Sequence, residues 1–290
     1  MKFKSYAKVN LSLDVTGKRE DGYHLLKMVM QSISLYDEID IELTPESGVI
    51  LTTDKPYIPV DDRNIAKKAA DLFLKKIDSD KGVKIHITKN IPVAAGLAGG
   101  STNGGTVLRV LNKLFGYPIS EDELLKLGLE LGADVPFTMI GGTALCEGVG
   151  EIITNLKDFS NHTLVLVKPP FGISTGSVFK SLKVEMIRIH PETEKLIEAI
   201  EEDNLESAAN YMKNVLENVS LNKHPILRKI KTDLVRYGAL TSLMTGSGPS
   251  VFGFFDDDEK AFRASNKMMV KNPETFVIKT IDRGTVNKDW

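Results

Sequence analysis

One stretch of the sequence, NIPVAAGLAGGSTNGGTVL from Asn90 to Leu108, is so rich in glycine and alanine that it restricts how the chain can fold. Glycine permits positive φ and lets backbone amides approach a ligand closely. A glycine-rich turn that enters a helix can place several N–H donors around an anion, and the helix dipole adds to the field. The stretch therefore predicts a phosphate-binding loop, with a tight turn between a packed strand and helix as the alternative.

The loop matches neither of two common nucleotide-binding motifs. No Gly-Lys-Ser/Thr follows Gly100, as a Walker loop requires, and Ala98 interrupts the dinucleotide pattern G-x-G-x-x-G. The loop by itself does not decide between phosphate binding and close packing, so the rest of the chain has to decide.

The size and charge of the chain favour work on small molecules. A chain of 290 residues with 42% apolar and 26% charged residues can bury a substantial core and predicts about two domains. The formal net charge is -2 and no basic cluster is present, so neither nucleic acid nor a membrane surface is an expected partner. Nothing in the composition indicates an oligomeric state.

Cysteine usage and the N-terminal segment indicate a cytoplasmic protein. The single cysteine, Cys146, cannot form an internal disulfide, and the five histidines show no metal-ligand spacing. The opening MKFKSYAKVNLSLDV carries charges where a signal peptide needs an unbroken apolar core, and no run of 18 apolar residues occurs. We therefore expect a protein that is neither secreted by that route nor membrane-spanning.

The first half of the sequence interleaves strand and helix patterns. From Ala7 to Val15, apolar residues alternate strictly with polar ones, which predicts a half-buried strand with Lys8, Asn10 and Ser12 on one face. Further strands are predicted at residues 38–43, 49–53, 83–88 and 143–147, and helices at residues 64–77 and 120–132.

After about residue 155 the order of elements changes. Strands are predicted at residues 163–168, 241–245, 250–256 and 275–281, and helices at residues 192–202, 205–218 and 225–237. This pattern indicates a second α+β unit. We place the N-terminal domain at residues 1–155 and the C-terminal domain at residues 156–290.

Three further segments resemble, in order and spacing, a known family. They are AKVNLSLDVTGKREDGYHLLKMVMQSISLYD (Ala7 to Asp37), LGADVPF (Leu131 to Phe137) and TGSGPSVFGFF (Thr245 to Phe255). Together with PVAAGLAGGST they resemble the GHMP kinase superfamily over nearly the whole chain. The resemblance implies an α+β fold of two domains, an N-terminal domain like ribosomal protein S5 domain 2 and a ferredoxin-like C-terminal domain. ATP and substrate would meet in the cleft between them.

The resemblance also implies an activity, the ATP-dependent phosphorylation of an alcohol group on a small molecule. Tyr23 and His24, following the Lys8-x-Asn10 strand, resemble the members that act in the non-mevalonate isoprenoid pathway. Those members phosphorylate the 2-hydroxyl of a methylerythritol unit that carries cytidine diphosphate. Because no acidic pair marks a metal site, we expect Mg²⁺ to arrive with ATP. The alternatives are another kinase of the superfamily, acting on homoserine, mevalonate or a sugar, and a nucleotide-binding relative without catalysis.

Two residues are implied to carry the chemistry. By resemblance, Asp134 takes the proton of the substrate hydroxyl, and its alternative role is to cap a helix that begins at Val135. Lys8 would stabilise both the carboxylate and the charge of the transition state, or else belong to a solvated strand face. Asn10, on the same face, fits a residue that holds the hydroxyl.

The remaining site residues are implied to bind ligands. ATP would be bound by Pro92, Val93, Ala94, Ala95, Gly96, Leu97, Ala98, Gly99, Gly100, Ser101 and Thr102. Tyr23 and Phe179 would stack on the two faces of cytosine and His24 would hydrogen-bond it, unless Tyr23 and His24 form an ordinary exposed turn and Phe179 is a core residue. Gly246, Ser247 and Gly248 would border the site from the C-terminal domain.

The sequence departs from the family pattern at Asn103, Gly104 and Gly105. The family usually carries an acid there, followed by small helix-forming residues such as alanine, so the departure alters both the charge near the phosphates and the first turns of the helix. Glycine costs about 0.5–1 kcal/mol relative to alanine inside a helix. We therefore expect Gly104→Ala and Gly105→Ala to be stabilising, provided that φ is negative and a methyl group fits.

Overall fold

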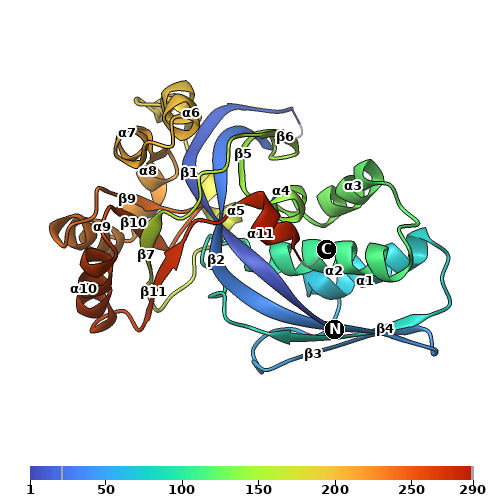
Figure 1. Ribbon diagram of the computed structural model, residues 1–290. Helices are drawn as coiled ribbons and strands as arrows, with labels where there is room; N and C mark the ends of the chain where they lie inside the picture. The colour runs from blue at the N-terminus through green and yellow to red at the C-terminus, as the bar shows by residue number, and fades with distance from the viewer. Residues whose placement is uncertain (21, 289–290) are drawn as a thin grey trace.

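The computed structural model describes residues 1–20 and 22–288, which form two α+β lobes side by side (Figure 1). The first lobe holds a 7-stranded sheet with the order β3-β4-β2-β1-β8, and β5 and β6 branch from β2. Its strands are β1 (Lys2–Lys18), β2 (His24–Thr44), β3 (Gly48–Thr53), β4 (Gly82–Thr88), β5 (Thr143–Gly148), β6 (Ile152–Asn155) and β8 (Lys213–Asn214).

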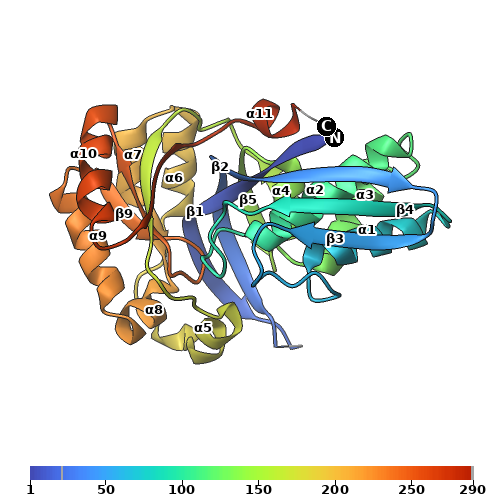
Figure 2. The same ribbon diagram turned by 90° about the horizontal axis from the view of Figure 1, so that it is seen from below.

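Four helices cover one face of this sheet. They are α1 (Ile65–Lys76), α2 (Gly99–Leu114), α3 (Glu121–Leu131) and α4 (Val135–Ile140). Apolar residues of the four helices join apolar residues of β2, β3 and β4 in one buried cluster, in which Phe73, Ile85 and Leu108 are almost fully buried. In Figure 2 these helices lie together behind strands β2, β3 and β4.

The strand β1 is buried on both faces. The alternation from Ala7 to Val15 predicted a half-buried strand, but all of these residues are buried. Its apolar residues Ala7, Val9 and Leu11 pack in a cluster with residues of the second lobe. Lys8 and Asn10 are covered as well, and each forms a buried hydrogen bond. The prediction of a half-buried strand was wrong because sequence periodicity does not show what covers the polar face.

The second lobe is a 4-stranded antiparallel sheet with helices on both faces. Its strands are β7 (Thr163–Lys168), β9 (Thr241–Met244), β10 (Val251–Phe255) and β11 (Glu274–Lys279), in the order β11-β7-β10-β9. Its helices are α5 (Thr175–Ser181), a 3₁₀ turn at Val184–Met186, α6 (Thr193–Glu201), α7 (Leu205–Tyr211), α8 (Glu217–Lys223), α9 (Ile226–Arg236) and α10 (Asp258–Met269). Helix α11 (Arg283–Asn287) returns to pack on α4 and β1.

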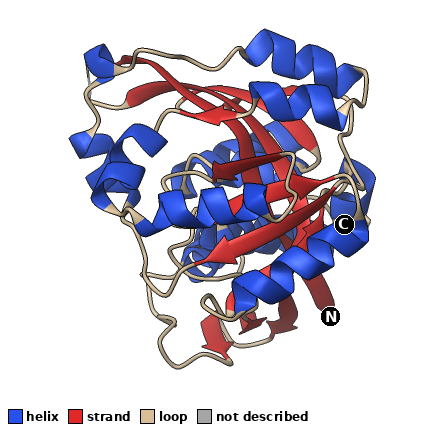
Figure 3. Cartoon of the chain, turned by 90° about the vertical axis from the view of Figure 1, so that its left-hand side faces the viewer, coloured by secondary structure: helices blue, strands red, loops and turns tan. Residues whose placement is uncertain are grey.

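The second sheet uses both faces of each strand for packing. Along β7, Leu164 and Leu166 enter one core cluster with residues of α6, while Val165 and Val167 enter another with residues of α9 and α10. Helices and strands of this lobe lie in layers in Figure 3. We propose that the boundary between the two domains falls between residues 155 and 156, where the chain passes from β6 toward β7.

The predicted helix at residues 205–218 was wrong. Helix α7 ends at Tyr211, and the chain then forms β8 and a second helix, α8. Strand β8 pairs in parallel with Ser12 and Leu13 of β1. The side chain of Asn214 donates to the carbonyl oxygens of Met244 and Gly246, at 2.7 and 2.8 Å. These tertiary contacts interrupt the helix, and no local pattern in the sequence reports them.

The glycines of α2 lie where helices pack closely. A Cβ at position 104 would lie 2.6 Å from Cγ2 of Ile65, and one at position 105 would lie 2.9 Å from Cγ of Met139 and from Oγ1 of Thr138. The methyl group required for the expected stabilisation therefore does not fit at either position. These two glycines serve the packing of α2 against α1 and α4, and the expectation from helix propensity was wrong.

We predict that Gly105→Ala lowers the free energy of unfolding by about 1–3 kcal/mol, because the added methyl group overpacks the contact with α4. The matched control is Gly176→Ala in α5, where a Cβ would meet nothing closer than 4.0 Å. That change should leave stability unchanged or raise it by up to about 1 kcal/mol. Urea denaturation of both variants measures the difference. A Gly105→Ala protein at least as stable as the wild type would contradict the packing argument.

Candidate active site

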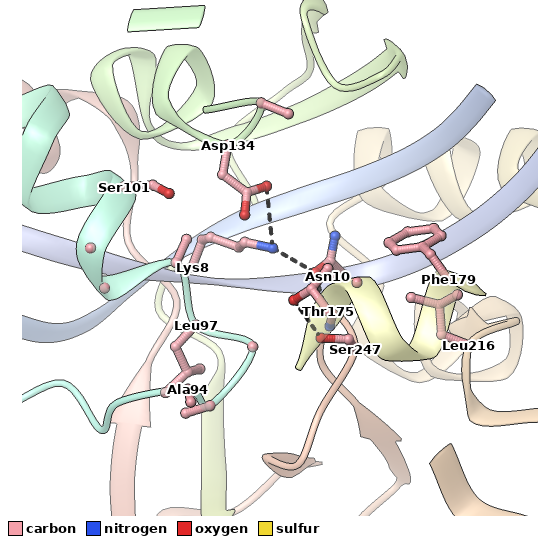
Figure 4. Close-up of a pocket in the computed structure, with 18 of the residues that line it drawn as sticks. Lys8, Asn10, Ala94, Leu97, Ser101, Asp134, Thr175, Phe179, Leu216 and Ser247 are labelled. Atoms are coloured by element: carbon pink, nitrogen blue, oxygen red, sulfur yellow. Dashed lines mark hydrogen bonds and ion pairs between the residues drawn. The ribbon is translucent and has the colours of Figure 1, made fainter. Parts of the chain in front are cut away.

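A single large cleft of about 1230 Å³ is lined by residues of both lobes. The first lobe contributes the glycine-rich loop, β1, the start of β2 and the turn before α4. The second lobe contributes residues from Thr175 to Glu185 together with Gly246 and Ser247. Figure 4 shows side chains from these segments pointing into the same space. The volume is large enough for a nucleotide and a second small molecule together.

The glycine-rich loop ends at the N-terminus of the 16-residue helix α2. The residue before the helix, Ala98, has a left-handed backbone with φ of 57°, and no side chain caps the helix. The first backbone N–H groups of a helix have no partner inside it. The loop therefore presents donors and the positive end of the helix dipole to the cleft, as phosphate binding requires.

One glycine of the loop is required by geometry. Gly96 has φ of 75°, and a Cβ there would lie 2.3 Å from the carbonyl oxygen of Thr245 in the second lobe. Thr245 Oγ1 also donates to the carbonyl oxygen of Gly96, at 3.2 Å. Gly99 and Gly100 lie within α2 and do not have positive φ. Position 96 therefore requires glycine because the chain approaches the second lobe closely there. The role proposed for the loop as a whole follows instead from the uncapped N-terminus of α2.

A buried carboxylate fixes the start of the glycine-rich loop. Asp37 of β2 is fully buried, and its two oxygens accept four hydrogen bonds. The donors are the backbone amides of Asn90 and Ile91, each at 2.8 Å, the ammonium group of Lys89 at 2.6 Å and the side-chain amide of Asn103 at 2.9 Å. Asp37 therefore joins β2, the start of the loop and α2 at one point.

Asn103 belongs to this buried network. Its amide nitrogen donates to Asp37 Oδ2 and to the hydroxyl of Ser5, and the residue is 3% exposed. An amide suits this place because it can donate to a carboxylate, which a second carboxylate cannot do unless it is protonated. The departure from the family pattern at this residue is therefore matched by contacts within the fold.

Lys8 and Asp134 meet at the centre of the cleft. Lys8 Nζ lies 3.7 Å from Asp134 Oδ1 and donates to Asn10 Oδ1 at 2.8 Å (Figure 4). The side chain of Lys8 is 5% exposed and that of Asp134 is 36% exposed, so the carboxylate is open to the cleft while the ammonium group is enclosed. The alternative of a solvated strand face is wrong for Lys8.

The capping role considered for Asp134 is not what the side chain does. Asp134 directly precedes α4, but its side chain forms no capping hydrogen bond and its own backbone is helical, with φ of -78° and ψ of -18°. Its carboxylate turns instead toward Lys8, as Figure 4 shows. A carboxylate beside an enclosed ammonium group is an arrangement that can accept a proton from a bound hydroxyl.

Asn10 links the two lobes beneath this pair. Its side-chain oxygen accepts from the backbone amide of Gly246 at 3.1 Å, and its own backbone amide donates to Thr245 Oγ1 at 3.1 Å. Ser247, next in the same turn, lies 2.9 Å from the hydroxyl of Thr175. The turn after β9 is thereby fixed against the glycine-rich loop and β1.

The end of the cleft away from the glycine-rich loop is lined by aromatic side chains. Tyr23 and His24 lie where the β1–β2 hairpin turns back, and Tyr23 is 66% exposed. The rings of His24 and Phe179 lie 5.2 Å apart, with an angle of 33° between their planes. Burial lowers the pKa of His24 below its usual value, and the charge of Lys18 lowers it further. The imidazole is therefore neutral at neutral pH and offers one donor and one acceptor.

The cleft contains most of the residues that the sequence indicated, with two differences. Thr102 is buried and its hydroxyl donates to the carbonyl oxygen of Tyr6 at 2.7 Å, so it joins α2 to β1. Thr102 and Gly248 are not among the lining residues, whereas Ser101, Gly246 and Ser247 are. The sequence did not indicate the lining residues Lys18, Ile58, Pro59, Arg63, Lys89, Lys180, Leu182, Val184 and Glu185. Lys18 lies inside the Ala7–Asp37 segment and Lys89 adjoins the glycine-rich loop, whereas the others belong to no motif.

Residues 1–20 and 22–288 hold neither a cluster of metal ligands nor a membrane-spanning helix. These residues contain no group of three or more His, Cys, Asp or Glu side chains placed to hold a metal ion. Within the same ranges, every helix is too short or too polar to cross a membrane.

Cys146 lies in β5 near the Lys8–Asp134 pair. Burial raises the pKa of its thiol to about 12, and the charge of Asp134 contributes to this shift. It stays protonated at neutral pH.

Comparison with known proteins identifies the family of this chain. The family model described as GHMP kinases N terminal domain matches residues 64–142, and the model described as GHMP kinases C terminal matches residues 188–272. The chain is 58% identical over 278 residues to 4-diphosphocytidyl-2-C-methyl-D-erythritol kinase of Clostridium botulinum (strain Kyoto / Type A2). That match covers 96% of this chain and 99% of the relative.

Solved structures have the same fold. A crystal structure of 4-(cytidine 5'-diphospho)-2C-methyl-D-erythritol kinase superposes with a TM-score of 0.83 at 30% identity, over 97% of this chain and 99% of that one. A homoserine kinase from Cytophaga hutchinsonii superposes with a TM-score of 0.75 at 18% identity, over 97% of this chain and 95% of that one, which supports the fold alone. The chain has the two-domain α+β architecture of small-molecule kinases and belongs to the GHMP kinase family.

Proposed function

We propose that this protein transfers the γ-phosphoryl group of ATP to the 2-hydroxyl of 4-diphosphocytidyl-2-C-methyl-D-erythritol. The observation that carries the proposal is that one cleft has a phosphate-binding helix N-terminus, a central Lys8–Asp134 pair and an aromatic far end. The similarity to relatives of that name supports the choice of substrate. The order of these parts matches a donor phosphate, a reacting hydroxyl and a nucleobase.

The phosphates of ATP would lie at the start of α2. Backbone amides from Gly99 to Ser101 would bind their oxygens, and the helix dipole would offset part of their charge. Mg²⁺ would enter with ATP as part of the substrate, bound by phosphate oxygens and water. Ser101 is the hydroxyl at the helix start that lines the cleft, so it is the side chain best placed to contact the phosphates.

The transfer itself needs an aligned hydroxyl and a group that takes its proton. Asp134 would accept the proton from the substrate hydroxyl while the hydroxyl oxygen bonds to the γ-phosphorus and the bond to the leaving ADP breaks. Lys8 would stabilise the carboxylate before transfer and the negative charge around the phosphorus during transfer. Because Asn10 holds the Lys8 ammonium group at 2.8 Å, the charge is already positioned.

The aromatic end would select the substrate. Cytosine would lie against Tyr23 and Phe179, and the neutral His24 would hydrogen-bond its polar edge. Each stacked aromatic face contributes about 1–3 kcal/mol, which is enough to favour a substrate with a nucleobase over a bare polyol.

A coupled assay of ADP release tests the proposal. The protein should release ADP with the cytidyl substrate and MgATP, and release little with homoserine, mevalonate or methylerythritol alone. A preference for one of these other alcohols would assign the chain to a different activity in the family. ATP binding without ADP release on any of them would indicate a nucleotide-binding relative.

We predict that Asp134→Asn lowers kcat by about 10²–10⁴, the usual effect of removing a general base. Lys8→Met should lower kcat comparably, and the double variant should lose less than the product of the two effects, because both residues serve one step. ATP affinity by calorimetry and the melting temperature serve as controls and should stay near wild type. Near-normal turnover of Asp134→Asn would remove the base from the mechanism.

We predict that Tyr23→Ala weakens binding of the cytidyl substrate by about 1–3 kcal/mol, because one stacking face is lost. The affinity for ATP should not change, since the glycine-rich loop lies at the other end of the cleft. Steady-state KM values for the two substrates measure the difference. Equal losses for both substrates would contradict the placement of the base at Tyr23.

A further inference from the structure

The aromatic end of the cleft is assembled from two segments that are distant in sequence. The β1–β2 hairpin carries Tyr23 and His24, and the segment from Thr175 to Ile187 carries Phe179. The rings of His24 and Phe179 lie 5.2 Å apart across this junction. Since the two segments belong to different lobes, something has to hold Phe179 at this distance from the hairpin.

Apolar contacts help to keep the segment from Thr175 to Ile187 against β1. Ile187 is buried in the same cluster as Leu13 and Val15 of β1, and Leu182 and Val184 pack against that cluster. The segment forms the 7-residue helix α5 and one 3₁₀ turn, and its internal hydrogen bonds are local. Local hydrogen bonds do not fix a segment against another lobe, so its position relative to the hairpin depends on contacts outside it.

Two side-chain contacts join the chain just after this segment to the hairpin, one between His190 and Asp14 and one between Lys27 and Glu194. His190 Nδ1 lies 2.8 Å from Asp14 Oδ1 and 3.0 Å from Oδ2, and Lys27 Nζ lies 2.5 Å from Glu194 Oε1. Asp14 and Lys27 face each other across β1 and β2 in the sheet register. His190 and Glu194 lie before and within α6, which packs beside β2. The two pairs therefore cross from one lobe to the other at neighbouring points.

The Asp14–His190 pair is the stronger of the two. The side chain of Asp14 is only 9% exposed, and within the hairpin it accepts a hydrogen bond from the backbone amide of Val15 at 2.8 Å. A carboxylate at this depth needs close hydrogen-bond partners to offset its loss of water, and the imidazole of His190 lies within hydrogen-bonding distance of both of its oxygens. The Lys27–Glu194 pair is more exposed, at 28% and 72%, so solvent screens it and it contributes less.

We propose that Asp14 and His190 are positioning residues for the substrate site. The contact between their side chains, supported by the Lys27–Glu194 ion pair, holds the segment from Thr175 to Ile187 against the hairpin and so keeps Phe179 opposite Tyr23 and His24. Neither residue is among those that line the cleft, so both act through Phe179. The identity of the substrate in this proposal rests on the proposed function. The geometric part, that the contact holds the segment against the hairpin, does not.

Hydrogen–deuterium exchange of the protein without substrate tests the geometric part. In Asp14→Asn and in His190→Gln, the backbone amides of residues 179–187 should exchange about three- to tenfold faster than in the wild type. The matched control is Glu192→Gln, which removes one carboxylate from a pair with Lys195 that stays within one segment. Exchange in that control should match the wild type. Unchanged exchange in both test variants would overturn the proposal.

Kinetics test the consequence for the site. Both variants should raise KM for the cytidyl substrate about three- to tenfold, with kcat and KM for ATP within about twofold of wild type. Parallel losses in all three constants with a lower melting temperature would mean that the pair only stabilises the fold, and would overturn the positioning role. If the wild type does not use the cytidyl substrate, the proposed function fails, while the exchange result still decides whether the Asp14–His190 contact holds the segment.

Discussion

The buried carboxylate of Asp37 fixes the part of the molecule on which the cleft depends. A loop of small residues has few side-chain contacts of its own, so its shape must come from outside. Asp37 accepts from the amides of Asn90 and Ile91 at the start of the loop, from Lys89 beside it and from Asn103 inside α2. Burial lowers the pKa of Lys89, and the charge of Asp37 opposes that shift. Since a buried charge is costly without partners, the four donors and the carboxylate hold one another in place.

The proposed catalytic centre is positioned on this fixed loop by contacts between the lobes. Gly96 approaches Thr245 so closely that a side chain would not fit, and Asn10 joins β1 to the backbone of Gly246. Asn214, brought in by the short strand β8, holds the same turn from the other side. Lys8 is thereby enclosed while Asp134 stays open to the cleft. This difference in exposure suits a fixed positive charge beside a carboxylate that exchanges a proton with its ligand.

The glycines illustrate how one residue type serves different physical needs. Gly96 has positive φ, as expected of glycine in this loop, but its close approach is to Thr245 of the second lobe. Gly104 and Gly105 instead make room for Ile65 of α1 and for Thr138 and Met139 of α4. Ala98, not a glycine, takes the left-handed conformation before α2. Helix propensity alone misjudged Gly104 and Gly105, because the space beside a helix belongs to its neighbours.

The sequence by itself indicated the family through the resemblance of four segments. It determined the α+β class, most of the strands and helices, and the loop that enters α2, because periodicity and glycine spacing are local properties. It also indicated Lys8, Asn10, Asp134 and the aromatic residues, which the structure brings into one cleft. Only the tertiary structure decided that the helix predicted at residues 205–218 breaks to form β8, that both faces of β1 are buried, and that Thr102 turns away from the cleft. It alone also showed Asp37 beneath the loop and Asp14 paired with His190. These outcomes depend on partners that lie 52 residues away in the chain or more, and a local pattern carries no information about them.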